Sequence, residues 1–328
     1  MESYLEKAKE LVNQGAALHV NGHLEAAKEK YRQALEIDDH NSTVLNNLGL
    51  LLTQEGKYDS AIEFYNQSIE LNDGNPTAYL NLANALVYKG ELKQAAEYLK
   101  KSIDYNNKNE LAWQSMAKLM FLVKRPDKAA EAWSNAIRLN PNNLEYQVEL
   151  AINYAALQKY NPAIEVLSNV LSINPNHQRA LVQLGIIYLI RQDLTYAYDM
   201  LKKGVKLNPN DEFARHHLAI TLISLGKIEE AKNELESLIE INHENIKARV
   251  ELAVLELSDH NYDKSLYHLD ESLKIDPKYS KALFYKAMTL YELKEYQESK
   301  NLMEEVIKLP DNAHSEKAKK FIEEHLIT

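Results

Sequence analysis

The sequence predicts an all-α protein, an α-solenoid of antiparallel helix pairs that recur every 34 residues. A small residue, Gly or Ala, recurs nine times at intervals of 34 residues: Gly15, Gly49, Ala83, Ala117, Ala151, Gly185, Ala219, Ala253 and Ala287. A second small residue, Ala or Ser, lies twelve positions after each of these, from Ala27 to Ser299. Two small-residue columns with one period indicate that two backbones approach closely in every repeat, as in a repeat array.

The period divides nearly the whole chain into nine repeats within one expected domain, 1–328. Counted from Ala8, they span 8–41, 42–75, 76–109, 110–143, 144–177, 178–211, 212–245, 246–279 and 280–313. Each contains two apolar stretches whose residues are three or four apart, such as Leu45, Leu48 and Leu52 in the second repeat. This spacing predicts two helices per repeat, each with one apolar face.

Two breaks punctuate each repeat. Gly22, Gly56, Gly90 and Gly226 occupy the fifteenth place, where glycine accepts the left-handed conformation that ends a helix. Gln, Lys or His holds this place in the other repeats, at an expected conformational cost. Proline at place 32 of four repeats, from Pro141 to Pro277, ends the second helix.

A last helix is predicted over 314–328. Its apolar residues Ala318, Phe321, Ile322 and Leu326 are spaced to cover the ninth repeat, while lysines and glutamates keep the other side polar. A solenoid needs such a cap to keep its end face out of water.

Composition restricts the class of function. The chain has 328 residues, a net charge of −10 and no cysteine. The negative charge opposes binding to nucleic acid or to anionic membranes. No apolar stretch is long enough to insert into a membrane, and the charged N-terminal segment is no secretory signal, so we expect a cytoplasmic protein. We find no phosphate-binding loop, catalytic motif or metal-ligand spacing, and expect a non-enzyme without cofactor or metal.

The repeats resemble the tetratricopeptide repeat family. The fourth repeat carries the family pattern closely in Trp113, Ala117, Ala129, Trp133 and Pro141. The resemblance implies a right-handed superhelix in which the first helix of each pair lines a concave groove. It also implies that places 2, 5, 6, 9, 12 and 13 point into that groove.

Place 6 then forms a polar column along the groove. It holds Asn13, Asn47, Asn81, Ser115, Glu149, Gln183, His217, Glu251 and Tyr285. Asn84 at place 9 extends it. An asparagine side chain both donates and accepts hydrogen bonds, so such a ladder can hold an extended peptide by its backbone. The alternative is a hydrated groove without a ligand.

An apolar stripe is expected farther along the groove. Place 9 holds Ile152, Ile186, Ile220 and Val254, and place 5 holds Val148, Val182 and Val250. Apolar residues on an exposed wall mark contact surfaces. The alternative is that they pack in the core.

Some repeats depart from the family pattern. Place 4 holds Gln147, Arg215 and Arg249 instead of bulky apolar residues, which predicts thinner contacts there. We expect Glu256 and Lys286 to pair across the last two repeats, because a lone buried carboxylate is too costly to keep ionised. The alternative is that both reach solvent.

The sequence favours a non-catalytic scaffold that binds a peptide or helical segment of a protein partner in its concave groove. One alternative is a structural protein that assembles with copies of itself into a homo-oligomer. Another is a regulatory subunit or ligand-responsive sensor whose superhelix changes pitch, because contacts in an array are only between neighbours. The sequence does not identify the partner.

Overall fold

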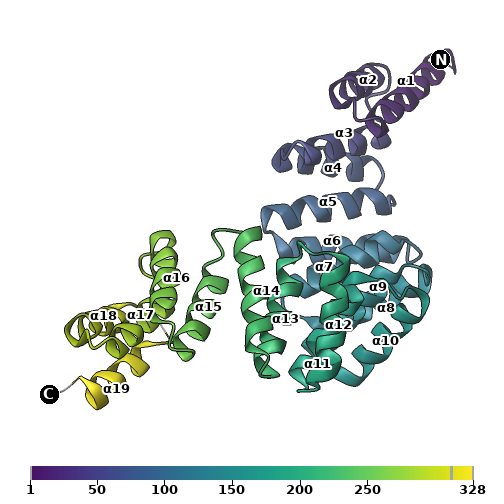
Figure 1. Ribbon diagram of the computed structural model, residues 1–328. Coiled ribbons are helices and arrows are strands. Elements are labelled where there is room, and N and C mark those ends of the chain that lie inside the picture. Colours follow the sequence, from purple (N-terminus) through teal and green to yellow (C-terminus); the bar gives the residue numbers. More distant parts are fainter. Residues whose placement is uncertain (1, 311–312, 327–328) are drawn as a thin grey trace. The chain divides into compact units, whose positions relative to one another are not determined.

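The computed structural model describes residues 2–310 and 313–326, and within them all regular structure is helical (Figure 1). The helices are α1 (Glu2–Val20), α2 (Leu24–Ile37), α3 (Ser42–Gln54), α4 (Tyr58–Leu71), α5 (Pro76–Lys89), α6 (Leu92–Tyr105), α7 (Glu110–Leu122), α8 (Pro126–Leu139), α9 (Leu144–Ala156), α10 (Tyr160–Ile173), α11 (Gln178–Ile190), α12 (Leu194–Leu207), α13 (Glu212–Ser224), α14 (Ile228–Ile241), α15 (Ile246–Ser258), α16 (Tyr262–Ile275), α17 (Ser280–Glu292), α18 (Tyr296–Lys308) and α19 (Ser315–His325).

Consecutive helices pack as pairs in the stretches α1–α8 and α11–α18, and neighbouring pairs within each stretch contact one another (Figure 1). The predicted all-α class is confirmed. Contacts divide the chain into two compact units, residues 1–166 and 167–328, which are described separately below as the N-terminal and C-terminal units.

The first helix of most pairs starts at a side-chain cap. The side-chain oxygens of Asn41, Asn75, Asn109 and Asn143 accept hydrogen bonds from backbone N–H groups of the first turns of α3, α5, α7 and α9. Asp211 and Asn245 cap α13 and α15 in the same way. These residues all occupy the last place of a repeat, so one short polar side chain fixes the start of the next helix.

The fifteenth place takes the left-handed conformation in every repeat. Four of these residues are the glycines, with φ from 73° to 81°. The other five are Lys124, Gln158, Gln192, His260 and Lys294, with φ from 58° to 65°. The left-handed conformation predicted for this place is confirmed, and non-glycine residues are expected to bear a conformational cost because a β-carbon crowds the backbone in this region.

Replacing Gln158 by Gly is expected to raise the free energy of unfolding by about 0.5–1 kcal/mol, because glycine adopts positive φ without that crowding. The reverse change, Gly56→Gln, should lower it, although no atom lies within 4 Å of the added β-carbon. Chemical denaturation followed by circular dichroism measures both. Unchanged midpoints would contradict this reading of the turn.

The two small-residue columns lie where the helices of a pair touch. A β-carbon on Gly49 would come within 2.6 Å of the Tyr65 ring, and one on Gly15 equally close to Tyr31. In the ninth repeat the Ser299 hydroxyl donates to the backbone carbonyl of Ala287 at 2.7 Å. Alanine at these places is fully buried. The predicted close approach is confirmed.

Ala151→Leu should therefore lower the free energy of unfolding by roughly 1–3 kcal/mol, because the larger side chain overpacks a close helix crossing. Ala156→Leu in the same helix is the matched control, since Ala156 is exposed. Denaturation of both variants measures the difference. Equal stability of the two would show that the crossing is not where the small residues lie.

The prediction that polar residues at place 4 make thinner contacts is wrong, because each of these residues forms a hydrogen bond. Gln147 Nε2 donates to the carbonyl of Pro141 at 3.1 Å, and Arg249 Nε donates to that of His243 at 3.1 Å. Arg215 Nε bonds the carbonyl of Pro209 at 2.9 Å. The Trp113 indole makes the same contact with a carbonyl six residues earlier, at 2.9 Å. In these four repeats place 4 thus holds the connection to the preceding repeat.

The predicted Glu256–Lys286 pair is wrong, and so is the alternative that both reach solvent. Glu256 is 3% exposed and lies 3.2 Å from Lys232, whereas Lys286 pairs with Asp270 at 2.8 Å. Both residues face the second helix of the preceding repeat, which carries their partners. Burial acts to lower the pKa of Lys232, but bonds from Asp259 and Glu256 outweigh it, so this pKa is raised.

The ends of the array differ from its middle. In α1, Glu10, Gln14 and Ala17 are exposed at the places where α3 buries Val44, Leu48 and Leu51. At the other end Ala318 of α19 is buried, and Phe321 and Ile322 pack against the cluster around Phe284. Residues 327–328 of the expected last helix lie outside the described residues. Polar or covered end faces are what a repeat array requires.

Candidate protein-binding surface

The first helices of the pairs present one shared face, which we call the A-helix face and define by places 2, 5, 6, 9, 12 and 13 of each repeat. In the N-terminal unit α1, α3, α5 and α7 contact one another in sequence. Of the predicted site residues there, Asn13 is exposed, and the rest are half-buried: Asn47, Asn81, Asn84, Glu149 and Ile152. In the C-terminal unit all the predicted residues are half-buried: Gln183, Ile186, His217, Ile220 and Glu251.

Some residues of the polar column form side-chain hydrogen bonds with the preceding repeat. Asn81 Nδ2 donates to Asn46 Oδ1 at 3.0 Å, and the latter side chain is only 6% exposed. In the C-terminal unit His216 Nε2 lies 2.9 Å from a Glu251 carboxylate oxygen, across the same 35-residue offset. Asn81 and Glu251 therefore join place 6 to place 5 of the preceding repeat, a role that the sequence analysis missed.

Asn47 also has a neighbour inside the protein. Burial raises the pKa of the Tyr31 phenol, and the nearby Asn47 amide opposes that rise. The Tyr31 hydroxyl is buried and makes no hydrogen bond of normal geometry with a described residue. Asn84 differs from Asn47 and Asn81, because its side chain forms no hydrogen bond within residues 2–310 and 313–326. Like the exposed Asn13, Asn84 is therefore available to a ligand.

The apolar stripe divides into two parts. At place 5, Val148 and Val250 are fully buried and Val182 is 2% exposed, so the core-packing alternative is correct there. At place 9, Ile152 in the N-terminal unit and Ile186 and Ile220 in the C-terminal unit remain half-buried. Of the predicted apolar stripe, place 9 is the part that remains at the surface.

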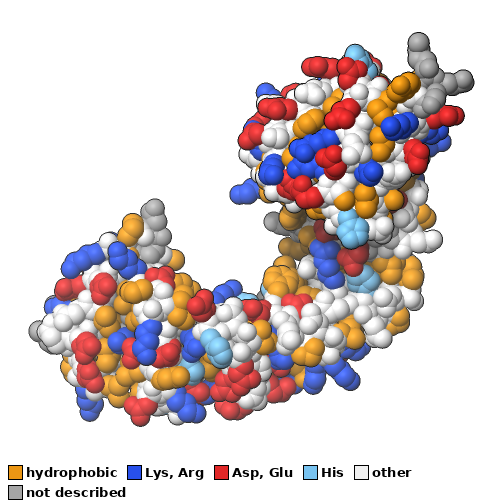
Figure 2. Space-filling model, turned by 90° about the horizontal axis from the view of Figure 1, so that it is seen from above, with side chains coloured by type: hydrophobic (Ala, Val, Ile, Leu, Met, Phe, Trp, Pro, Cys, Tyr) orange, Lys and Arg blue, Asp and Glu red, His pale blue; other side chains and the backbone are white. Residues whose placement is uncertain are grey.

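Several exposed apolar side chains of the face were missed. Tyr88 is 66% exposed, Phe121 49% and Leu122 55% in the N-terminal unit. In the C-terminal unit Ile190 and Phe213 are each more than half exposed. They occupy places 2, 12 and 13, so reading these three columns would have found them. On the side shown in Figure 2, hydrophobic side chains lie among acidic and basic ones.

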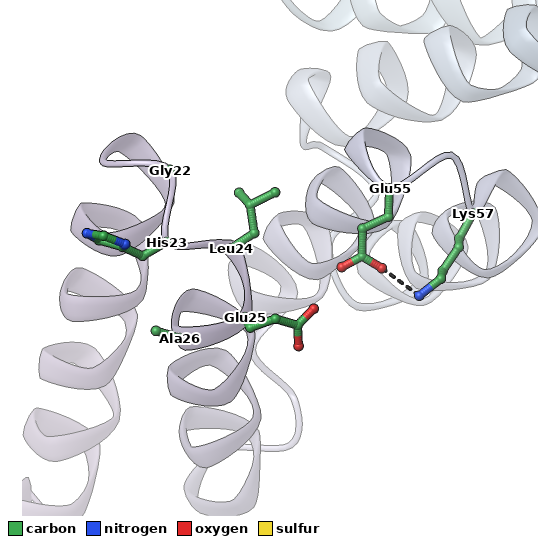
Figure 3. Close-up of a pocket in the computed structure, with 7 residues that line it drawn as sticks. All are labelled: Gly22, His23, Leu24, Glu25, Ala26, Glu55 and Lys57. Carbon is green, nitrogen blue, oxygen red and sulfur yellow. Dashed lines mark hydrogen bonds and ion pairs between the residues drawn. The ribbon is translucent and has the colours of Figure 1, made fainter.

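Two hollows lie elsewhere. One of about 730 Å³ in the N-terminal unit lies at the start of α2 and is bordered by Glu55 and Lys57 (Figure 3). Glu55 accepts hydrogen bonds from Lys57 at 2.7 Å and from Lys28 at 3.2 Å, so these charges already satisfy one another. The second, of about 210 Å³, lies between Tyr198 and Leu218 in the C-terminal unit.

The described residues contain no group of three His, Cys, Asp or Glu side chains that could hold a metal ion. None of the helices in the described ranges combines the length and the apolar character needed to cross a bilayer.

Known proteins share this architecture. A family model described as the cilia and flagella-associated protein 70 C-terminal domain, built of tetratricopeptide repeats, matches residues 5–220. Models of the tetratricopeptide repeat itself match residues 214–245 and 281–312. The chain belongs to this tetratricopeptide-repeat family. No curated protein matches the sequence.

Solved tetratricopeptide-repeat structures resemble the chain in fold. YrrB, described as a tetratricopeptide-repeat protein with an unusual peptide-binding site, has a TM-score of 0.51 at 22% identity, over 57% of this chain and 96% of its own. A tetratricopeptide-repeat protein from Parabacteroides merdae has a TM-score of 0.57 at 15% identity, over 76% of this chain and 99% of its own. The structure of pilF of Pseudomonas aeruginosa has a TM-score of 0.57 at 19% identity, over 65% of this chain and 97% of its own.

Histidines give the C-terminal unit of this tetratricopeptide-repeat chain a pH dependence. Burial lowers the pKa of His268, and Arg249 lowers it further. Burial also lowers the pKa of His217, against the opposing effect of the Phe213 carbonyl that its Nδ1 contacts at 2.8 Å. Each imidazole is neutral in the folded protein over a pH range in which the unfolded chain is protonated.

We expect the free energy of unfolding to fall as the pH is lowered from 7 to 5.5. Below the ordinary histidine pKa of 6.5 the unfolded state binds more protons than the folded state, so acid favours unfolding. Urea denaturation across this range should show a smaller pH dependence for His217→Gln/His268→Gln than for the exposed control His23→Gln. Identical dependence would contradict the burial argument.

Proposed function

We propose that this tetratricopeptide-repeat protein is an interaction scaffold that binds a peptide segment of a protein partner on its A-helix face. The observation that carries the proposal is the face itself. It exposes hydrogen-bonding and apolar side chains that neither the core nor the helix turns require. Contiguous apolar groups beside unsatisfied amides are typical of peptide-binding surfaces.

The chemistry of the face suits an extended or helical peptide. In the N-terminal unit Asn84 offers both a donor and an acceptor, and Ile152 offers apolar area. YrrB, with the same fold, is described as binding a peptide. The comparison supports the class of ligand, while the residues named here come from the geometry of this chain.

Asn84→Ala should weaken peptide binding about tenfold while leaving stability within about 0.5 kcal/mol, because no internal hydrogen bond is lost. Peptides are first selected from a random phage-displayed library on the wild-type protein, and their dissociation constants are then measured by fluorescence anisotropy. Gln94→Ala on α6 is the matched control, since Gln94 is an exposed amide away from the A-helix face.

Equal affinity of wild type and Asn84→Ala for every selected peptide would contradict binding on this face of the N-terminal unit. Asn81→Ala is not a clean probe. It leaves the buried Asn46 oxygen without its donor, at a cost of about 1 kcal/mol. Wild-type protein that enriches no peptide and instead grows in size with its own concentration would favour self-assembly.

A further inference from the structure

The end of α7 exposes an apolar run that packing does not explain. Phe121, Leu122 and Val123 follow one another and are 49%, 55% and 37% exposed. In an amphipathic helix the apolar residues face the core, so three consecutive exposed ones violate the pattern unless they contact something else. The residues just before them, Leu119 and Met120, do pack in the core of the N-terminal unit.

Tyr88, near the end of α5, adds an exposed aromatic side chain from the first helix of the preceding repeat. Tyr88 and Leu122 hold the same place in consecutive repeats, at the ends of α5 and α7, and these two helices contact each other. The Tyr88 ring is held by stacking on Tyr58, with centroids 5.1 Å apart and planes 7° apart. We call Tyr88, Phe121, Leu122 and Val123 the apolar rim. The stacked Tyr88 ring has a fixed place before any ligand binds, which lowers the entropic cost of binding.

The unpaired charges next to Phe121 and Leu122 are of one sign. Lys118 lies one helical turn before Phe121 and Leu122 on the same side of α7, and Lys124 follows the run directly. Both are exposed, and neither forms an ion pair or side-chain hydrogen bond with the described residues.

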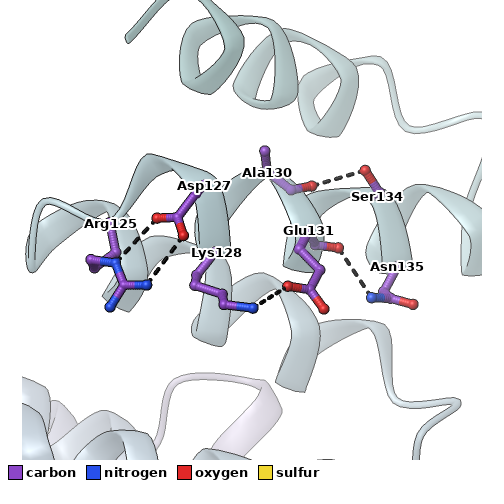
Figure 4. A network of polar contacts seen from close by, with 7 residues as sticks. All are labelled: Arg125, Asp127, Lys128, Ala130, Glu131, Ser134 and Asn135. Carbon is purple, nitrogen blue, oxygen red and sulfur yellow. Dashed lines mark hydrogen bonds and ion pairs between the residues drawn. The ribbon is translucent and has the colours of Figure 1, made fainter. Parts of the chain in front are cut away.

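The other charged residues close in sequence are already paired. Arg125 pairs with Asp127 through two hydrogen bonds of 3.2 and 3.1 Å, and Lys128 pairs with Glu131 at 2.8 Å (Figure 4). Lys89, next to Tyr88, pairs with Asp59 at 2.6 Å and with Glu91 at 3.0 Å. Lys118 and Lys124 are therefore the unpaired cations beside Phe121 and Leu122, whereas the group around Lys89 keeps one excess negative charge near Tyr88.

The two repeats that carry the rim also have a positive net charge. Residues 76–143 contain ten Lys and Arg and six Asp and Glu, within a chain whose net charge is −10. The two repeats that carry the rim are thus locally basic in an acidic protein. An acidic ligand is attracted there and repelled by most of the remaining surface.

From this combination we infer the kind of partner, on the basis of the proposed function. The apolar rim binds an acidic segment of another protein, in which one or two bulky apolar side chains are flanked by Asp or Glu. The apolar side chains cover Phe121, Leu122 and Tyr88, and the carboxylates reach Lys118 and Lys124. Protein interfaces usually have a buried apolar core surrounded by a rim of polar and charged residues.

Two fluorescein-labelled peptides of twelve residues test the inference. The acidic probe has a central Phe-Leu pair flanked on each side by Asp and Glu, and the basic probe has Lys at those flanking positions. Anisotropy titration should show the acidic probe binding at least about tenfold more tightly than the basic one, with affinity falling as salt rises. Replacing its Phe-Leu pair by Gly-Ser should abolish binding.

Matched variants separate the two contributions. Phe121→Ser/Leu122→Ser should lose the acidic probe, whereas Leu5→Ser, which removes an apolar side chain that is 57% exposed on α1, should not. Lys118→Glu/Lys124→Glu should reverse the preference toward the basic probe. Lys93→Glu/Lys100→Glu makes the same charge change at exposed positions of α6 and should leave the preference unchanged.

Equal binding of the two probes, or binding of neither, would overturn the inference. So would a dimer that Phe121→Ser/Leu122→Ser converts to monomer, because the rim would then join copies of this chain. Binding to phosphatidylserine vesicles that depends on Leu122, without binding of the acidic probe, would also overturn it. If library peptides still require Asn84 while the probes fail, the proposed function stands and only the assignment to the rim falls.

Discussion

The close approach of two helices at a pair of small residues is the constraint on which the rest of the fold depends. At Gly49 there is no room for a β-carbon beside Tyr65, and at Ala287 a backbone carbonyl lies within hydrogen-bond distance of Ser299. This contact fixes how each pair crosses. The left-handed residue at place 15 then returns the chain, and the side-chain cap at place 34 starts the next helix. Because most repeats use the same three devices, the side chains of one column recur at equivalent positions.

That recurrence produces the candidate surface. Once the second helix and the neighbouring repeats have covered their parts of a first helix, places 6, 9, 12 and 13 remain for solvent or a ligand. Place 5 does not, as the burial of Val148 and Val250 shows. The surface is therefore a consequence of the packing, and its chemistry can vary without loss of the fold. Asn84, Lys118 and Leu122 are free to vary in this sense, whereas Asn81 is not, because it bonds Asn46.

Features that depend on one residue and its own backbone could be predicted from the sequence. Helix pairs, the left-handed turns and the small-residue columns are of this kind, since the steric limits of glycine and of a β-carbon act locally. Partners that lie across a repeat boundary could not be predicted. Glu256 was assigned to Lys286 because the two are complementary, but the direction of its place selects Lys232. The polar side chains at place 6 were interpreted as available to a ligand, but Asn81 and Glu251 instead bond residues at place 5 of the preceding repeat. Most of the apolar rim lies in the columns of places 12 and 13, so it could have been predicted from the repeat register, although the exposure of each side chain at the end of its helix could not.

The account claims above all that partners meet the chain on its A-helix face. Site-specific photo-crosslinking tests this most directly, with benzoylphenylalanine placed at Asn84 in one variant and at Gln94 in another, and the adducts mapped by mass spectrometry. The account predicts a partner adduct at position 84 and none at position 94. Adducts that form at position 94 but not at position 84 would contradict it, because the partner would then lie on the second helices of the pairs.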